Sequence, residues 1–304
     1  MTTVLRTVPV SLPDLPALAD HAIQGKATVP AAWLLDLLVR TTTEANAVAD
    51  PTTKLVAFPL VMRAAIFPRF LPADEVEQCT FEVALDDVVG EDAKASTRAT
   101  LTSRIALSGG ICRTRKHAAV TVGGSLPLPP SPPAEVACDL ELLAQRAYAE
   151  LIPFGPHYRN LRGQIRLGRD GGTGWVASPE PVGPEPSRAG CPYLFDSAMH
   201  LACLWGQRYA GVVAYPTGYS ARAISSPLAH GQRRCVVVPR SIGSSVASSV
   251  GLSVESRGLT FDLWLADENH RVCDTIVGLT MAPVARGPLP PAWIVHPQAF
   301  LHTP

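Results

Sequence analysis

The sequence predicts an α+β protein in which one buried helix followed by several antiparallel strands occurs twice. Two observations indicate this fold class. The 304-residue chain contains a Pro-rich segment at 123–133, whose composition is incompatible with a helix or a central strand. On each side of it, an apolar run of helical length is followed by shorter runs of strand composition. Each half therefore fits a sheet wrapped around a central helix.

The Pro-rich segment separates two parts of ordinary domain size. We predict an N-terminal domain at residues 1–123, an extended linker at 124–135 and a C-terminal domain at 136–304. In the first domain, a buried helix is expected over 31–40, beginning at or just after Pro30. The strand-like runs that follow it lie at 80–85, 99–107 and 117–122.

In the second domain, the apolar segment 194–207 predicts a helix of about four turns. Residues 267–270 predict a hairpin turn, and so does the Gly-rich stretch 168–174, which lacks the Lys-Ser/Thr ending of a phosphate-binding loop. The strand-like runs lie at 234–239, 246–253, 259–266 and 271–281.

Composition excludes several classes of function. Lys plus Arg equals Asp plus Glu at 26 each, so charge gives no argument for a nucleic-acid or anionic-membrane partner. No apolar run reaches transmembrane length and the N-terminus lacks a signal-like core, so we expect a cytoplasmic protein. The seven cysteines form no CxxC pair, and no His-x-x-x-His cluster is present, so we predict no metal site.

The first group of candidate site residues is His21, Gly25 and Pro30, just before the first helix. A His in a partly apolar loop can be neutral and take a proton. A Gly four residues later lets the backbone approach a substrate, with its N–H free to bind an oxygen. The alternative is that His21 is an ordinary packing or surface residue.

The second group is Asp196 and His200, four residues apart in the apolar segment 194–207. On a helix they share one face, one turn apart. Burial of Asp196 raises its pKa and favours a proton-carrying acid, which His200 could orient, whereas a helix N-terminus favours the carboxylate. The alternative is that Asp196 caps the helix and His200 is a satisfied core histidine.

Together these groups resemble the dehydratase domains of type I polyketide synthases, in the dehydratase/product-template superfamily. The family's patterns are His-x3-Gly-x4-Pro and Asp-x3-Gln/His, and its Tyr-Gly-Pro-x-Phe segment is similar to 154–158 here. Phe154 replaces the family's Tyr, and His157 follows the Gly-Pro pair. The resemblance extends from about 19 to 284 and includes iterative and trans-acting types, so a free-standing enzyme and an excised domain both remain open.

The resemblance implies a double hotdog, with two antiparallel sheets each wrapped around a central helix. It implies that His21 is the catalytic base and Asp196 the catalytic acid in water loss from a β-hydroxyacyl thioester. The substrate would be a polyketide or fatty acyl chain on the phosphopantetheine of an acyl carrier protein, with no other cofactor, and the enzyme a homodimer. The substrate-binding residues it implies are Gly25, Pro30, Phe154, Gly155, Pro156, Tyr158 and His200.

Two other functions remain open. One is an isomerase or cyclase on a polyketide chain, by double-bond shift, oxa-Michael or aldol ring closure, because these reactions use the same His/Asp pair. The other is a non-catalytic double hotdog that binds a carrier protein, although retention of both His21 and Asp196 disfavours it. Arg222, Arg233 and Arg234 are candidates for contact with an acidic carrier protein.

Overall fold

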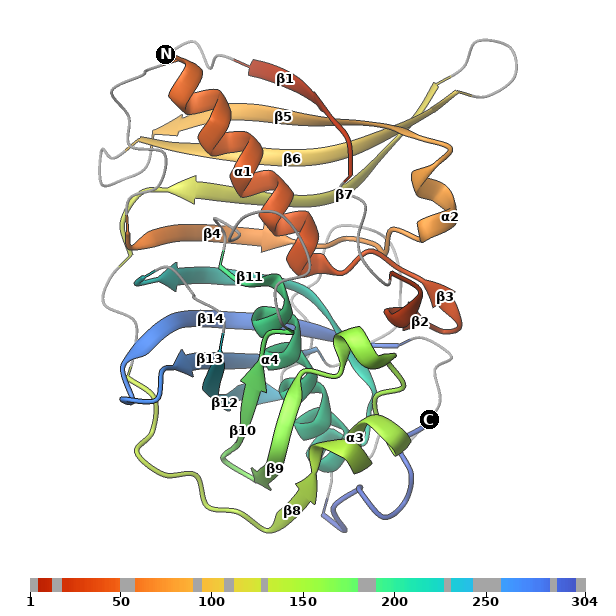
Figure 1. The fold of residues 1–304 in the computed structure, drawn as a ribbon, viewed down its shortest axis with the longest axis vertical. Helices are drawn as coiled ribbons and strands as arrows, with labels where there is room; N and C mark the ends of the chain where they lie inside the picture. The colour runs from red at the N-terminus through yellow and green to blue at the C-terminus, as the bar shows by residue number, and fades with distance from the viewer. Residues whose placement is uncertain are drawn as a thin grey trace.

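The computed structural model describes residues 5–12, 18–49, 58–89, 95–106, 112–126, 131–179, 190–226, 231–242, 258–284 and 289–298. Within these residues, twelve strands form one antiparallel sheet (Figure 1). Its order is β1-β5-β6-β7-β4-β11-β14-β13-β12-β10-β9-β8, and β2 and β3 form a separate small hairpin.

The first half of the chain confirms the predicted helix. α1 begins at Ala31, directly after Pro30; the strands predicted at 80–85 and 117–122 fall within β5 and β7, and the one at 99–107 lies within β6 up to residue 106, beyond which the structure does not describe the chain. The elements of this half are β1 (Leu5–Val10), η1 (Leu18–Asp20), β2 (Ala22–Ile23), β3 (Lys26–Ala27), α1 (Ala31–Ala49), β4 (Leu60–Ile66), α2 (Ala73–Val76), β5 (Thr80–Val89), β6 (Ala95–Ala106) and β7 (Cys112–Gly123).

The second half confirms both hairpin turns, because β9 and β10 flank 169–170 and Asp267 N–H donates to Arg271 O at 2.9 Å. The strand predicted at 259–266 coincides with β13, whereas 246–253 lies outside the described residues. Its elements are β8 (Leu140–Leu143), α3 (Ala144–Glu150), η3 (Pro156–Tyr158), β9 (Leu161–Gly168), β10 (Gly171–Ala177), α4 (Pro192–Trp205), the π-helical turn η4 (Gly206–Ala210), β11 (Ala214–Ile224), β12 (Gln232–Ile242), β13 (Leu259–Ala266) and β14 (Val272–Pro283).

The expectation of two separate sheets is wrong, because the strands of both halves join into one. β4 pairs with β11 in antiparallel register, from Leu60 opposite Ile224 to Ile66 opposite Gly218. Without this pairing each half would end in an edge strand with a row of unpaired backbone N–H and C=O groups. Each half nevertheless keeps its own helix, with α1 against β5–β7 and α4 against β9–β13 (Figure 1).

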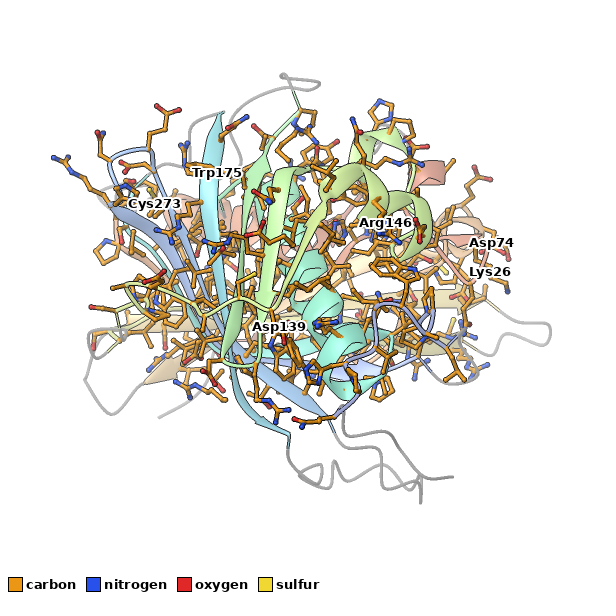
Figure 2. The ribbon with its side chains drawn as sticks, turned by 90° about the horizontal axis from the view of Figure 1, so that it is seen from below. Lys26, Asp74, Asp139, Arg146, Trp175 and Cys273 are labelled. Atoms are coloured by element: carbon orange, nitrogen blue, oxygen red, sulfur yellow. The ribbon has the colours of Figure 1, made fainter. Side chains whose placement is uncertain are left out.

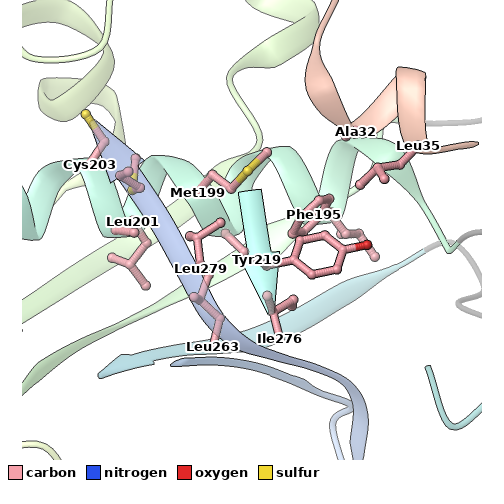
Figure 3. Close-up of a cluster of buried hydrophobic side chains, with 14 of the residues drawn as sticks. Ala32, Leu35, Phe195, Met199, Leu201, Cys203, Tyr219, Leu263, Ile276 and Leu279 are labelled. Carbon is pink, nitrogen blue, oxygen red and sulfur yellow. The ribbon is translucent and has the colours of Figure 1, made fainter. Parts of the chain in front are cut away.

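Every residue of the second helix, α4, is buried. A helix that is apolar all round is typical of an element enclosed by others. Figure 2 shows α4 behind the strands β9 and β10, and Figure 3 shows Leu201 on the side of α4 that faces Leu263 of the sheet. The two helices meet where the rings of Trp33 and Tyr193 pack edge to face at 5.5 Å. The site described below lies close to this junction.

One ion pair is fully buried beneath α4. Arg222 on β11 donates from Nε and Nη2 to the carboxylate of Asp274 on β14, at 3.0 and 2.6 Å, and its guanidinium lies 4.2 Å from the ring of Phe195. Arg222 is only 2% exposed, so the expectation that it meets a carrier protein is wrong. The guanidinium of Arg222 is bound by Asp274 inside the fold, and the spacing of residues in the sequence does not reveal this pairing.

The segment 289–298 packs against the end of α4. Arg208 donates to Ile294 O at 3.0 Å and to Asp139 Oδ1 at 2.9 Å; Asp139 is labelled in Figure 2. The guanidinium of Arg146 lies 3.8 Å from the ring centroid of Trp293. In the described part of the chain, no helix has both the length and the apolar character needed to cross a membrane.

Candidate active site between the two halves

The imidazole of His21 is held by a short hairpin. Gln24 and Gly25 connect β2 to β3, and both have positive φ, as a type I′ turn requires. The hairpin returns Thr28 to His21, where Thr28 N–H donates to His21 O at 2.9 Å. Nδ1 of His21 lies 2.7 Å from Thr28 O, which can only accept, so Nδ1 carries the ring proton. In the neutral imidazole, Nε2 therefore presents a lone pair.

Asp196 and His200 lie on α4 and face the same way. The N-cap residue of α4 is Cys191, so Asp196 stands beyond the first turn and the alternative of a capping aspartate is wrong. His200 Nε2 lies 3.0 Å from Asp196 Oδ2, but this geometry is not that of a hydrogen bond. Both atoms are buried and have no hydrogen-bond partner within the described residues, so they remain available to a ligand.

The fold brings the two halves of the site together. His21 Nε2 lies 3.9 Å from Asp196 Oδ1, and each residue is 5% exposed. Phe154 stacks on the His21 ring with centroids 4.5 Å apart and lies 4.9 Å from the His200 ring. Tyr158 packs on the other side of His21 at 5.0 Å. These aromatic rings thus hold both imidazoles in position.

A cavity of about 400 Å³ opens onto these residues. Of the residues predicted from the sequence, it is lined by His21, Gly25, Phe154, Asp196 and His200. The other four predicted residues do not line it: Pro30, Gly155, Pro156 and Tyr158. Pro30 precedes α1, and Tyr158 is completely buried behind His21. These residues shape the site without reaching its surface.

Gly155 has a structural role that the structure makes clear. The N–H of Gly155 donates to the carbonyl oxygen of Asp20 at 2.7 Å. The side-chain oxygen Oδ2 of Asp20 accepts from the backbone N–H of His157 at 3.0 Å and lies 2.7 Å from Nδ1 of His157. The pKa of Asp20 is lowered by these hydrogen bonds to His157. These hydrogen bonds, which we call the Asp20 clamp, connect Asp20 to Gly155 and His157. They therefore fix the position of His21 relative to Phe154.

Replacing Gly155 with alanine is expected to disturb this clamp, because the new Cβ would overlap the carboxylate of Asp20. We expect the free energy of unfolding to fall by about 1–3 kcal/mol. The displacement of His21 should also reduce turnover by roughly tenfold or more. Denaturant unfolding and turnover of the two proteins measure this. The matched control is Gly174→Ala, where the new Cβ makes only ordinary contacts, and equal effects from both variants would contradict the clamp.

Tyr148 belongs to the site but has no signal in the sequence. Its Oη accepts from Leu161 N–H at 2.9 Å and lies 3.1 Å from His200 Nδ1. Burial raises the pKa of Tyr148, so the phenol keeps its proton. Donation of that proton to His200 Nδ1 would place the His200 N–H at Nε2, facing Asp196. The hydroxyl of Tyr148, six residues before Phe154, thus contacts the His200 imidazole beside Asp196, whereas Phe154 has no hydroxyl to offer.

Replacing Tyr148 with phenylalanine is expected to reduce kcat by roughly tenfold to a hundredfold with little change in KM, because His200 would lose the hydrogen-bond partner that fixes its orientation. The comparison of kcat with KM separates this effect from a general loss of structure. Tyr193→Phe is the matched control, since its buried hydroxyl has no hydrogen-bond partner within the described ranges. A kcat for Tyr148→Phe equal to that of Tyr193→Phe would overturn the assignment.

The protonation states follow from burial and neighbouring charges. Burial lowers the pKa of His21, although Asp196 and the Thr28 carbonyl act to raise it, so the free imidazole is neutral at neutral pH. Burial acts to raise the pKa of Asp196, but the His200 imidazole, through its charge and its contact with the carboxylate, and the charge of His21 outweigh it and leave that pKa below its usual value. The protonation states of His21 and Asp196 therefore depend on one another.

No cluster of three or more His, Cys, Asp and Glu side chains suited to a metal ion occurs where the structure describes the chain. The arrangement offers instead an unprotonated ring nitrogen facing a carboxyl group across an enclosed, aromatic-lined cavity. Such a pair can remove a proton from one atom of a substrate and supply one to another.

Comparisons with known proteins give a fold relationship. Neither the scan of protein-family models nor the search of curated sequences gives a match. Among solved structures, the dehydratase domain of PpsC from Mycobacterium tuberculosis is similar with a TM-score of 0.66 and 17% identity, over 93% of this chain and 94% of that chain. The dehydratase domains of the CurJ and CurK modules of the Curacin polyketide synthase each give 0.63, at 16% and 14% identity. They cover 93% of this chain and 92% and 94% of their own.

These structures confirm the resemblance at the level of fold. The chain has the hotdog architecture of polyketide synthase dehydratase domains over nearly its whole described length. At this sequence identity the similarity establishes the fold alone. The reaction must be inferred from the residues of the site.

Proposed function

We propose that this protein removes water from a β-hydroxyacyl thioester to give an α,β-unsaturated acyl chain. The observation that carries the proposal is the 3.9 Å approach of His21 Nε2 to Asp196 Oδ1 inside one cavity. Water loss needs a base at the α-carbon and an acid at the β-hydroxyl, and these two groups are carried by adjacent carbons of the substrate. A base and an acid this close can reach both of them in one bound pose.

In this proposal His21 is the base. Its Nε2 takes the α-proton, the electrons of the broken C–H bond form the C=C bond, and the imidazolium is stabilised by Nδ1–H donation to the Thr28 carbonyl. The low pKa that burial gives His21 keeps Nε2 unprotonated beforehand. The N–H of Gly25, in the hairpin turn at the cavity mouth, would hold the thioester oxygen as negative charge develops there.

Asp196 is the acid. Its Oδ1 faces His21, and a proton on this oxygen would pass to the β-hydroxyl, so that the C–O bond breaks and water leaves. Tyr148 supports this side of the site, because its hydroxyl lies 3.1 Å from His200 Nδ1 and holds that imidazole beside Asp196. Burial of the carboxyl favours the protonated form that an acid needs and opposes the lowering of its pKa by His200 and His21.

Two similar proteins support these roles. A His-to-Phe variant of the CurJ dehydratase and an Asp-to-Asn variant of the CurK dehydratase are described as inactive. Polyketide chains are carried as thioesters, so we propose an acyl carrier protein as the partner that delivers the substrate. A homodimer remains part of the proposal.

The experiment is incubation of the protein with a β-hydroxybutyryl pantetheine thioester, followed by mass spectrometry. Loss of one water supports dehydration. An unchanged mass with a rearranged double bond, measured with an enoyl thioester, would instead support an isomerase. No change with any thioester, together with binding of a carrier protein, would support the non-catalytic alternative.

The pH dependence of kcat/KM should show an acid limb below pH 6.5, the ordinary pKa of histidine. A protonated His21 cannot act as base, and because its pKa is lowered, the neutral form persists to a lower pH than for an exposed histidine. Activity should therefore be retained through pH 6.5 and lost as the pH falls further. A limb centred at or above pH 6.5 would contradict the assignment of His21.

A further inference from the structure

The cavity does not stop at the catalytic pair. Its exposed lining residues, including Gln24, Gly25 and Arg69, lie around the β2–β3 hairpin, where Val29 N–H donates to Leu71 O at 2.9 Å and ties the two segments together. These residues mark the mouth. The lining then continues past Asp196 to residues of which four are buried (Met199, Cys203, Ala214 and Met281) and two are half-buried (Val213 and Val284), so a bound chain would extend into the protein beyond the reacting atoms.

The inner part of the cavity follows α4. Asp196, Met199 and Cys203 recur at intervals of three and four residues, which places them along one face of the helix, and all three line the cavity. Figure 3 shows Met199 and Cys203 on the side of α4 opposite Leu201, whose side chain points toward the sheet. Cys203 lies seven residues beyond Asp196, or about 10 Å along the axis at about 1.5 Å per residue.

The inner lining is apolar. Past Asp196 and His200 it is formed by the side chains of Met199, Cys203, Val213, Ala214, Met281 and Val284. None of these carries a charge, an amide or a hydroxyl group. Burial raises the pKa of the Cys203 thiol, so this group stays uncharged. An oxygen substituent on a chain bound here would leave water without gaining a side-chain hydrogen-bond partner.

We infer that the inner cavity is a binding subsite for a hydrocarbon acyl tail, alkyl or polyene, and that Cys203 limits the length of the tail. This inference rests on the proposed dehydration and names its substrate class. An extended chain advances about 1.2 Å per bond, since one residue of three backbone bonds spans about 3.3–3.6 Å. The distance of about 10 Å therefore accommodates seven or eight carbons beyond the β-carbon. Tails that carry keto or hydroxyl groups are disfavoured.

The test compares three pantetheine thioesters with the wild-type protein: 3-hydroxybutyryl, 3-hydroxydecanoyl and 3,7-dihydroxydecanoyl. The last two differ by one hydroxyl in the tail. We expect kcat/KM for 3-hydroxydecanoyl to exceed that for the dihydroxy compound by roughly tenfold to a hundredfold. Equal values for these two substrates would overturn the inference, and this comparison requires no variant.

The role of Cys203 is tested with Cys203→Phe, which fills the cavity two turns past Asp196. We expect kcat/KM for 3-hydroxydecanoyl to fall about tenfold or more, while 3-hydroxybutyryl, which is too short to reach Cys203, stays within about twofold. Cys203→Ala is the control that leaves the cavity open, and it should retain both substrates. A Cys203→Phe protein that still prefers the decanoyl substrate as strongly as the wild type would contradict the length limit.

The two failures are distinguishable. If the wild-type protein dehydrates none of the three thioesters, the proposed function fails. If it dehydrates the short substrate and treats the two long ones alike, dehydration stands and only the hydrocarbon subsite is wrong.

Discussion

Replacing His21 with glutamine is expected to reduce kcat for dehydration by about a hundredfold to ten-thousandfold. Nε2 of His21 is the unprotonated nitrogen that faces Asp196, and the amide of glutamine cannot take up a proton at neutral pH. The second imidazole does not replace it, because Nδ1 of His200 contacts Tyr148 and its Nε2 lies 3.0 Å from Asp196 Oδ2. The measurement is the rate of water loss from 3-hydroxybutyryl pantetheine.

A change of fold is excluded by a parallel measurement. His21 stacks on Phe154, packs against Tyr158 and is held by the Thr28 carbonyl, so its replacement could loosen the hairpin. Denaturant unfolding of the His21→Gln protein should therefore be recorded beside the rate. A folded variant with a wild-type rate would show that another group removes the proton.

Replacing Asp274 with asparagine is expected to lower the free energy of unfolding by about 3–5 kcal/mol. The variant leaves the guanidinium of Arg222 buried without its counter-charge, and Arg222 and Asp274 are 2% and 0% exposed. Arg222 lies against the ring of Phe195, the residue before Asp196. Loss of the Asp274 carboxylate should therefore also loosen the packing around Asp196. Denaturant unfolding monitored by circular dichroism measures it.

The matched control is Glu150→Gln, which removes the carboxylate from the exposed pair that Glu150 makes with Arg146. The Glu150→Gln change should lower the free energy of unfolding by less than about 1 kcal/mol. The double variant Arg222→Met with Asp274→Leu removes both charges and is expected to recover much of the stability, because no buried charge is then unpaired. An Asp274→Asn protein as stable as Glu150→Gln would contradict this account of the core.

The sequence was informative where structure is local. The helix after Pro30 and the i,i+4 pairing of Asp196 with His200 depend on neighbouring residues, so composition and spacing predict them. The His21–Asp196 approach joins residues far apart in the chain. Only the resemblance to a known family suggested it, because no spacing rule connects residues across a Pro-rich segment.

The parts that sequence did not predict depend on tertiary contacts. The pairing of β4 with β11 satisfies two strand edges at once, and no local pattern distinguishes a paired edge from an exposed one. Tyr148 meets His200 across 52 positions, and the partner of Asp20 is His157, 137 positions away. Arg222 was assigned to the surface because charged residues usually lie there, but Asp274 on the adjacent strand made its burial possible.

The central claim is that His21 and Asp196 divide the chemistry into removal of a proton and protonation of the leaving hydroxyl. The most direct test measures deuterium at the α-carbon of 3-hydroxybutyryl pantetheine incubated in D₂O with each variant. The Asp196→Asn protein, with its base intact, should exchange the α-proton without losing water, and the His21→Gln protein should do neither. Water loss at the wild-type rate by Asp196→Asn, or α-exchange by His21→Gln, would contradict the claim.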